Sequence, residues 1–115
     1  MNGTQIFITA LNMLGYTSSE RFNKKALSAL NQVYADIWYC VNDTDFVPLE
    51  KLSDNIELDA RILHDVMPYG VAAVLAQAEN DGDNQQYMSR IYNRKRASIN
   101  QMSNIVDTIP TPEEE

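Results

Sequence analysis

The sequence has few of the residues that build disulfide frameworks, zinc sites and turn-rich β-sandwiches. A single cysteine, Cys40, excludes a disulfide within the chain and any zinc site made of cysteines. Four glycines and four prolines leave little room for the frequent turns of a β-sandwich. The longest apolar run, 71–76, is far shorter than the roughly 20 residues that cross a bilayer, so we expect no membrane partner.

What the sequence does contain is the composition of one globular domain. Its 115 residues are 44% hydrophobic and 22% charged, which is typical of folded proteins and not of disordered ones. A chain of this length can bury roughly 65% of the surface of its unfolded form without cross-links. We therefore expect one hydrophobic core.

Apolar residues recur at steps of three and four in four stretches, which predicts an all-α fold, a small bundle of about four helices. The first helix is expected between Thr4, as its N-cap, and Gly15, as a left-handed stop. The second opens at Ser18 or Ser19, runs to about Val41 and has the strongest helical pattern in the chain.

The third stretch spans 59–78, with Asp59 as a candidate cap, and Pro68 inside it should kink or restart the helix. Asp83 is the candidate cap of a last helix that ends near Val106. Between the second and third helices, 42–55 predicts an ordered loop with at most one short extended piece. The chain is therefore divided into a helical domain, 1–106, and an extended acidic C-terminal arm, 107–115.

The net charge of −7 is distributed unevenly along the chain. Most of the acidic residues lie in 36–83, whereas 84–106 holds no acidic residue and four cations: Arg90, Arg94, Lys95 and Arg96. Three interpretations remain open. The cations form a solvated helix face, pair with the acidic segment of a neighbouring copy in a head-to-tail contact that can close into a ring, or face a nucleic-acid backbone.

The sequence offers little for catalysis, and we expect neither an enzyme nor a cofactor. His64 is the only histidine, for which we expect a structural or surface role, and Cys40 is expected in the core. No phosphate loop, dinucleotide fingerprint or G-x-S-x-G motif occurs. Two pairs of aspartates lie two residues apart: Asp43 with Asp45, and Asp81 with Asp83. Neither continues as an EF-hand loop does, so we expect turns and caps there and no metal site.

Aromatic side chains gather in the second helix at Tyr34, Trp38 and Tyr39. Trp and Tyr dominate the anchors of protein interfaces, but core packing against the segment around Phe46 is the favoured interpretation. The same preference for the core holds for three later tyrosines: Tyr69, Tyr87 and Tyr92.

The order of helices and short motifs along the chain is itself informative. A short capped helix and a long helix that ends in Ala35-Asp36-Ile37-Trp38 precede the acidic loop. The motifs that follow are Phe46-Val47-Pro48-Leu49, Ile56-Glu57-Leu58, Met67-Pro68-Tyr69-Gly70-Val71-Ala72, Leu75-Ala76 and Asp81-Gly82-Asp83-Asn84-Gln85. In this order, from about Ile6 to Ile99, the chain resembles the head-to-tail adaptor (connector) proteins of tailed bacteriophages.

The resemblance implies a helical bundle that assembles as a ring of twelve copies beneath the portal protein of a DNA-filled capsid. Such a ring extends the channel through which genomic DNA passes and provides the attachment platform for the next neck or tail component, a stopper or tail protein. It implies a location in the virion, at the neck between capsid and tail, and in the host cytoplasm during assembly. In that family the C-terminal arm commonly reaches toward the portal, and the residues that would do so here are Val106, Ile109, Pro110 and Pro112.

Within this interpretation the cations of the last helix have two possible roles. Either they line the channel, or they pair with acidic residues of the neighbouring copy. The acidic residues considered for that pairing are Asp43, Asp45 and Asp54. The alternative function is that of a small helical regulatory or DNA-binding protein, which would bind duplex DNA with a steep salt dependence.

Overall fold

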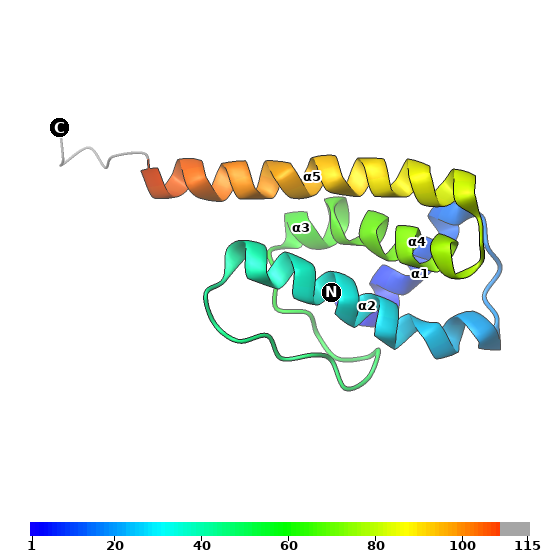
Figure 1. The fold of residues 1–115 in the computed structure, drawn as a ribbon. Helices are drawn as coiled ribbons and strands as arrows, with labels where there is room; N and C mark the ends of the chain where they lie inside the picture. Colours follow the sequence, from blue (N-terminus) through cyan, green and yellow to red (C-terminus); the bar gives the residue numbers. More distant parts are fainter. Residues whose placement is uncertain (109–115) are drawn as a thin grey trace.

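The chain folds as a bundle of α-helices in which α4 contacts all the others (Figure 1). A computed structural model describes the backbone of residues 1–108 and the side chains of residues 1–99. The helices, in chain order, are α1 (Gly3–Leu14), α2 (Glu20–Val41), α3 (Ala60–Asp65), α4 (Met67–Ala78) and α5 (Gly82–Thr108). Only one residue separates α3 from α4, and the described residues form no strand, so the predicted all-α bundle is confirmed.

The first helix begins two residues earlier than the sequence predicted, because Asn2 and not Thr4 is its N-cap. The Gln5 N–H donates to Asn2 Oδ1 at 3.0 Å, and the Asn2 N–H donates to Gln5 Oε1 at 2.9 Å, which forms a capping box. The reason is a tertiary contact: the Thr4 N–H donates to the Leu52 carbonyl at 2.9 Å. At the other end, Gly15 has a left-handed φ of 73° and is the predicted stop.

The second helix follows its prediction closely. Ser19 is the N-cap, and its hydroxyl accepts the Phe22 N–H at 3.4 Å. The buried face keeps the helical period along the whole helix: Phe22, Ala26, Ala29, Leu30, Val33, Tyr34 and Ile37. These side chains join one core with the buried residues of α1 and α4.

The restart predicted at Pro68 lies between α3 and α4. Asp59 caps α3 by accepting the Arg61 N–H at 2.8 Å. After α3 ends, α4 begins at Met67, so Pro68 occupies the first turn. Its missing N–H removes no helical hydrogen bond there, which explains why the proline is tolerated in a buried helix.

The close approach of three helices depends on Gly70, the fourth residue of α4. A Cβ atom on Gly70 would lie 2.8 Å from Val33 Cγ1 on α2 and 2.8 Å from Cε1 of Tyr92 on α5. Because both distances are shorter than carbon atoms normally approach, only glycine lets these helices pack at this separation. This contact sets the spacing between α2 and α5.

The predicted ordered loop, between α2 and α3, is tied to the helices by hydrogen bonds. The Asn31 side chain donates to the Leu49 carbonyl at 3.0 Å and accepts the Leu49 N–H at 2.8 Å. The Glu57 N–H donates to the Tyr34 hydroxyl at 3.1 Å. The predicted extended piece is reduced to one isolated β-bridge between this loop and the N-terminal segment.

The longest helix, α5, packs along α4 (Figure 1). Asp81, rather than the predicted Asp83, lies at its cap, because Asp81 Oδ1 accepts the Asn84 N–H at 3.4 Å. Asp83 lies in the first helical turn. Tyr16 lies just after the end of α1. Its hydroxyl donates to Asp81 Oδ2 at 2.6 Å and so holds this carboxylate at the start of α5.

The hydrogen bond between Tyr16 and Asp81 predicts a pH dependence of stability. The Tyr16 donor, with help from Asn84, lowers the pKa of Asp81. Burial and the Asp81 carboxylate raise the pKa of Tyr16 to about 12. The contribution of Asp81 is therefore present above its unfolded-state pKa of about 4 and is lost as the pH falls through the lowered folded-state value. The contribution of Tyr16 is present below about pH 10 and is lost as the pH rises toward about 12.

Urea denaturation of Tyr16→Phe across the pH range measures this effect. We expect the variant to be less stable than the wild type at neutral pH, with a difference that shrinks below about pH 4 and above about pH 10. Tyr87→Phe, which alters an exposed tyrosine, is the control and should change the stability little at any pH. If Tyr16→Phe loses the same amount of stability at every pH, the Tyr16 hydroxyl and the Asp81 carboxylate are not linked by this hydrogen bond.

Candidate functional site

The four cations predicted to act together on α5 have different surroundings. Arg96 pairs within its own chain, with Nε 2.7 Å from Oδ2 of Asp36. Lys95 Nζ lies 5.4 Å from the centre of the Tyr69 ring, which favours a cation–π contact. The two remaining cations are exposed and form no ion pair within the described part of the chain: Arg90 and Arg94.

The three acidic residues named from the sequence also differ. Asp54 acts locally, because its Oδ2 accepts the N–H groups of Glu50 and Lys51 at 3.0 and 3.1 Å. Asp43 and Asp45 are exposed in the loop that follows α2. None of the three forms an ion pair with a cation of α5 in the described structure. The described structure therefore does not bring these groups together within one chain.

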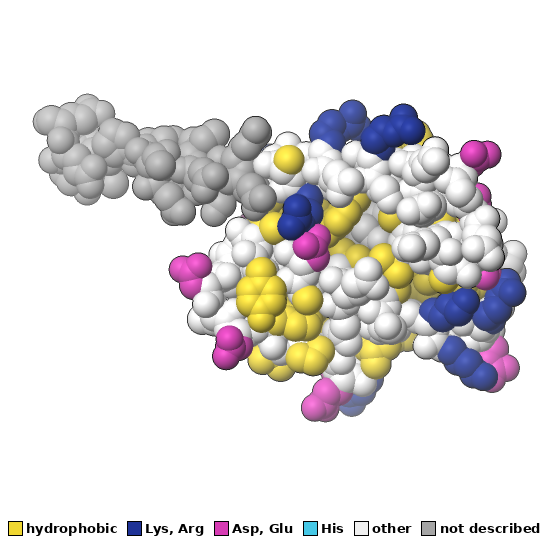
Figure 2. Space-filling view, in the orientation of Figure 1, with side chains coloured by type: hydrophobic (Ala, Val, Ile, Leu, Met, Phe, Trp, Pro, Cys, Tyr) yellow, Lys and Arg dark blue, Asp and Glu magenta, His cyan; other side chains and the backbone are white. Residues whose placement is uncertain are grey.

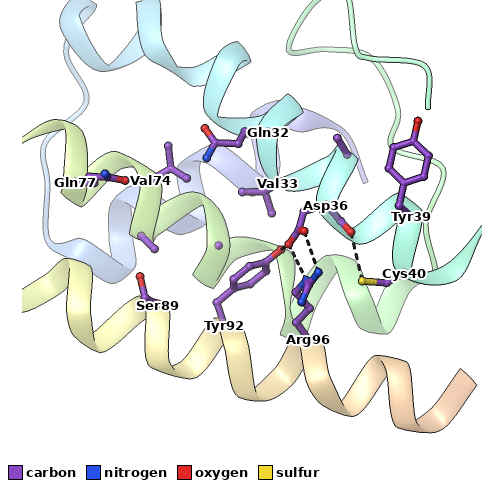
Figure 3. Close-up of a pocket in the computed structure, with 13 residues that line it drawn as sticks. Gln32, Val33, Asp36, Tyr39, Cys40, Val74, Gln77, Ser89, Tyr92 and Arg96 are labelled. Carbon is purple, nitrogen blue, oxygen red and sulfur yellow. Dashed lines mark hydrogen bonds and ion pairs between the residues drawn. The ribbon is translucent and has the colours of Figure 1, made fainter. Parts of the chain in front are cut away.

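A polar cluster that the sequence did not predict joins α2 to α5 (Figure 3). The Tyr92 hydroxyl donates to Asp36 Oδ2 at 2.6 Å, and Arg96 Nη2 donates to Asp36 Oδ1 at 3.1 Å. Burial and the Asp36 carboxylate raise the pKa of Tyr92, so its hydroxyl remains a neutral donor. The sequence did contain a signal for this cluster: Asp36 lies three positions after the apolar Val33, and Tyr92 and Arg96 lie four residues apart on the last helix.

A groove lies between α2 and α5, with α4 as its floor (Figure 3). Its volume is about 770 Å³, and the polar cluster spans it from one helix to the other. Small and apolar residues of α2 and α4 line part of it: Val33, Ala35, Gly70, Ala73 and Val74. The polar lining, outside the cluster, includes Gln32, Gln77 and Ser89. An apolar surface with a few polar groups is typical of a contact site.

Cys40 lies beside this groove and not in the core, contrary to the prediction. Its Sγ donates to the Asp36 carbonyl at 3.3 Å. Burial raises the pKa of Cys40, so the thiol stays protonated and is a poor nucleophile. His64 is exposed on α3 and does not line the groove. The groove therefore lacks a histidine base to activate the thiol.

The aromatic residues of α2 divide between the core and the surface. Tyr34 is buried and meets Phe46 edge to face, with ring centres 5.0 Å apart, which confirms the packing against the loop. Tyr39, however, is 61% exposed, contrary to the prediction. Its hydroxyl accepts the Phe46 N–H at 3.1 Å, and Trp38 Nε1 donates to the Thr44 carbonyl at 2.9 Å. These bonds hold the start of the loop against the end of α2.

Tyr87, predicted to lie in the core, is 59% exposed on α5. Its neighbour Met88 is buried, and the helical period places Tyr87 on the same outer face as Arg90 and Arg94. The other two tyrosines of the prediction pack against the core: Tyr69 and Tyr92. The outer face of α5 thus combines an aromatic ring with two cations that form no ion pair in the described structure.

The predicted portal-docking arm begins at the end of α5. The helix continues to Thr108, so the helical part extends past the predicted boundary at 106, and the backbone of Val106 is helical. Ile109, Pro110 and Pro112 lie outside the described residues. The structure therefore leaves the portal-docking role of these four residues as a prediction.

Comparison with known proteins assigns the chain to no family: no family profile, curated protein or solved structure matches it. In the part of the chain that the structure describes, no helix is long and apolar enough to cross a membrane. The same residues contain no group of three or more His, Cys, Asp or Glu side chains that could hold a metal ion. The groove and the exposed charges of α5 and of the loop after α2 are therefore the features from which a function is inferred.

Proposed function

We propose that the chain is a structural virion protein, a head-to-tail adaptor that forms a ring of twelve copies beneath the portal protein. The observation that supports this proposal is the separation of exposed charge on one helical bundle. Lys and Arg side chains lie over α5 and again over the start of α2, whereas Asp and Glu side chains flank an apolar patch near the other end of α2 (Figure 2). A subunit with complementary surfaces at two different places can bind its neighbours head to tail, and such contacts close into rings.

In this role the ring extends the DNA channel of the portal and carries the next neck or tail component, a stopper or tail protein. The work is done by shape and charge, and no bond is made or broken. The groove between α2 and α5 offers apolar contact area to a partner, and the cluster of Asp36, Tyr92 and Arg96 holds its walls at a fixed separation. The protein would act in the neck of the virion and assemble in the host cytoplasm.

Electron microscopy of the full chain mixed with portal rings encoded in the same genome tests this proposal. We expect an added ring of twelve-fold density on the tail side of the portal. Lys24→Glu, which reverses an exposed charge on α2, is the control and should stack like the wild type. Portals without added density, in the presence of a chain that is folded by circular dichroism, would contradict the proposal.

The alternative, a small regulatory or DNA-binding protein, is supported by the same exposed cations, Arg90 and Arg94. Two phosphate contacts per subunit would make the logarithm of the affinity for duplex DNA fall with the logarithm of salt concentration with a slope of about −2. A gel-shift titration at several salt concentrations measures that slope. Salt-dependent binding together with bare portals would favour this alternative.

A further inference from the structure

The outer face of α5 carries what we call the basic stripe: Tyr87, Arg90 and Arg94. Steps of three and four residues place these side chains on one face, opposite the buried Met88. Asp83 begins the same face one turn earlier, at the helix start, where an acid is favoured. Exposed tyrosine and arginine are the residue types that most often anchor protein interfaces.

The end of α2 and the start of the following loop form what we call the acidic end: Tyr39, Asp43, Asp45 and Val47. Tyr39 is 61% exposed and Val47 is 74% exposed. The hydrogen bonds from Trp38 and Phe46 already fix this segment, so little conformational freedom is lost when a partner binds. Figure 2 shows the apolar patch with acidic side chains on its flanks.

The acidic end also has an electrostatic reason to bind a cation. The last turn of a helix carries a partial negative charge, and α2 has no basic residue in its last turn. Asp43 and Asp45 add two carboxylates close to that terminus. Within the described structure, no cation forms an ion pair with either of them. A partner with a positive surface would therefore lower the energy of this end.

Exposed apolar side chains mark the same two surfaces. Among the described residues, the large apolar side chains with the greatest exposure are Ile8, Tyr39, Val47 and Tyr87. Three of these four belong to the basic stripe or to the acidic end. Each surface thus combines apolar area with charge, and the charges of the two surfaces are opposite. Because Arg96 and Lys95 have partners in their own chain, the complementarity involves only two cations.

We propose that the basic stripe of one copy binds the acidic end of a second copy. The two guanidinium groups pair with the carboxylates of Asp43 and Asp45. The Tyr87 ring covers the exposed side chains of Tyr39 and Val47. Each copy binds one neighbour through its basic stripe and the other neighbour through its acidic end. The contact is therefore heterologous and can repeat from copy to copy. This contact deepens the proposed function. That the repeated contact closes into a ring rests on the adaptor proposal.

Sedimentation velocity of the full chain at low salt, up to millimolar concentration, tests this contact. We expect the wild type to form species larger than a dimer. The double substitutions Arg90→Glu with Arg94→Glu, and Asp43→Arg with Asp45→Arg, should each weaken self-association at least about tenfold, because attraction becomes repulsion. Lys24→Glu, the matched charge reversal outside both surfaces, should not change it. All the altered side chains are exposed, so folding should be retained.

Restoring the charge match provides the decisive comparison. An equimolar mixture of the two double variants regains complementary charges at every contact, and so does a chain that carries all four substitutions. We expect both samples to associate again. A wild type that stays monomeric, a reversal on either surface that leaves association unchanged, or a mixture that stays dissociated would each overturn the contact. Association that stops at a dimer would overturn its head-to-tail arrangement.

The contact and the adaptor proposal can fail separately. Self-association with the expected charge dependence, but without stacking on portals, would contradict the adaptor and leave the contact standing. Rings on portals that form equally well from the reversed variants would contradict the contact and leave the adaptor standing. The two experiments use the same purified chains.

Discussion

Replacement of Gly70 by alanine is expected to lower the free energy of unfolding by about 1–3 kcal/mol, the usual cost of an extra methyl group in a packed core. Helix propensity alone would favour alanine by about 1 kcal/mol, so the sign of the effect identifies its cause. The added Cβ would lie 2.8 Å from Val33 Cγ1 and from the Tyr92 ring. The ring cannot yield without cost, because moving it stretches its hydrogen bond to Asp36.

Thermal and urea denaturation followed by circular dichroism measure this loss. Gly82→Ala is the matched control, because nothing lies within 4 Å of a Cβ at the start of α5 and its φ is not in the left-handed region. It should be neutral or slightly stabilising. In the double variant Gly70→Ala with Val33→Ala, part of the clash is removed, so the two losses should not add. If Gly70→Ala is as stable as the wild type, the three helices are not in close contact at this point.

The helices could be predicted from sequence because their apolar residues repeat at a helical period, and local caps fix most of their ends. Ser19, Asp59 and Gly15 act where the pattern placed them. Two caps were misplaced, and both errors have a tertiary cause. The start of α1 is fixed by hydrogen bonds to the loop between α2 and α3. The start of α5 is fixed by Tyr16, which lies 65 residues before Asp81 in the sequence.

The candidate site was less predictable, because its key pairings span most of the chain. The sequence indicates four cations on one helix, but it does not indicate that Arg96 meets Asp36, 60 residues earlier. The exposure of Tyr87 could have been predicted, since its spacing from Arg90 and Arg94 places all three on one face. Tyr39 could not, because its exposure depends on the path of the loop after α2.

The largest loss of stability is expected from Leu30→Ala, at about 2–5 kcal/mol. Leu30 is fully buried on α2. A Cβ on Gly3 would lie 3.1 Å from Leu30 Cδ1 and 3.3 Å from Leu49 Cδ1, so the leucine packs where α1, α2 and the loop meet. Truncation leaves a cavity lined by three segments, and the hydrogen bonds that tie the loop in place keep it from collapsing to fill the space.

Leu27→Ala, one turn earlier on the same helix, is the control. It distinguishes the cost of the cavity at Leu30 from the cost of truncating any leucine on α2. Leu27 is only partly buried, so less apolar area and a smaller cavity are involved, and its loss should be clearly smaller. Amide hydrogen exchange should also respond locally in Leu30→Ala. The N–H groups of Thr4 and Leu49 form hydrogen bonds across the same junction. Relative to the wild type, their exchange rates should rise more than those of the N–H groups of α5. Equal losses of stability from the two substitutions, or an equal rise in exchange rate at all amides, would mean that Leu30 does not pack at this junction. Leu30 would then not hold in place the loop that carries the acidic end.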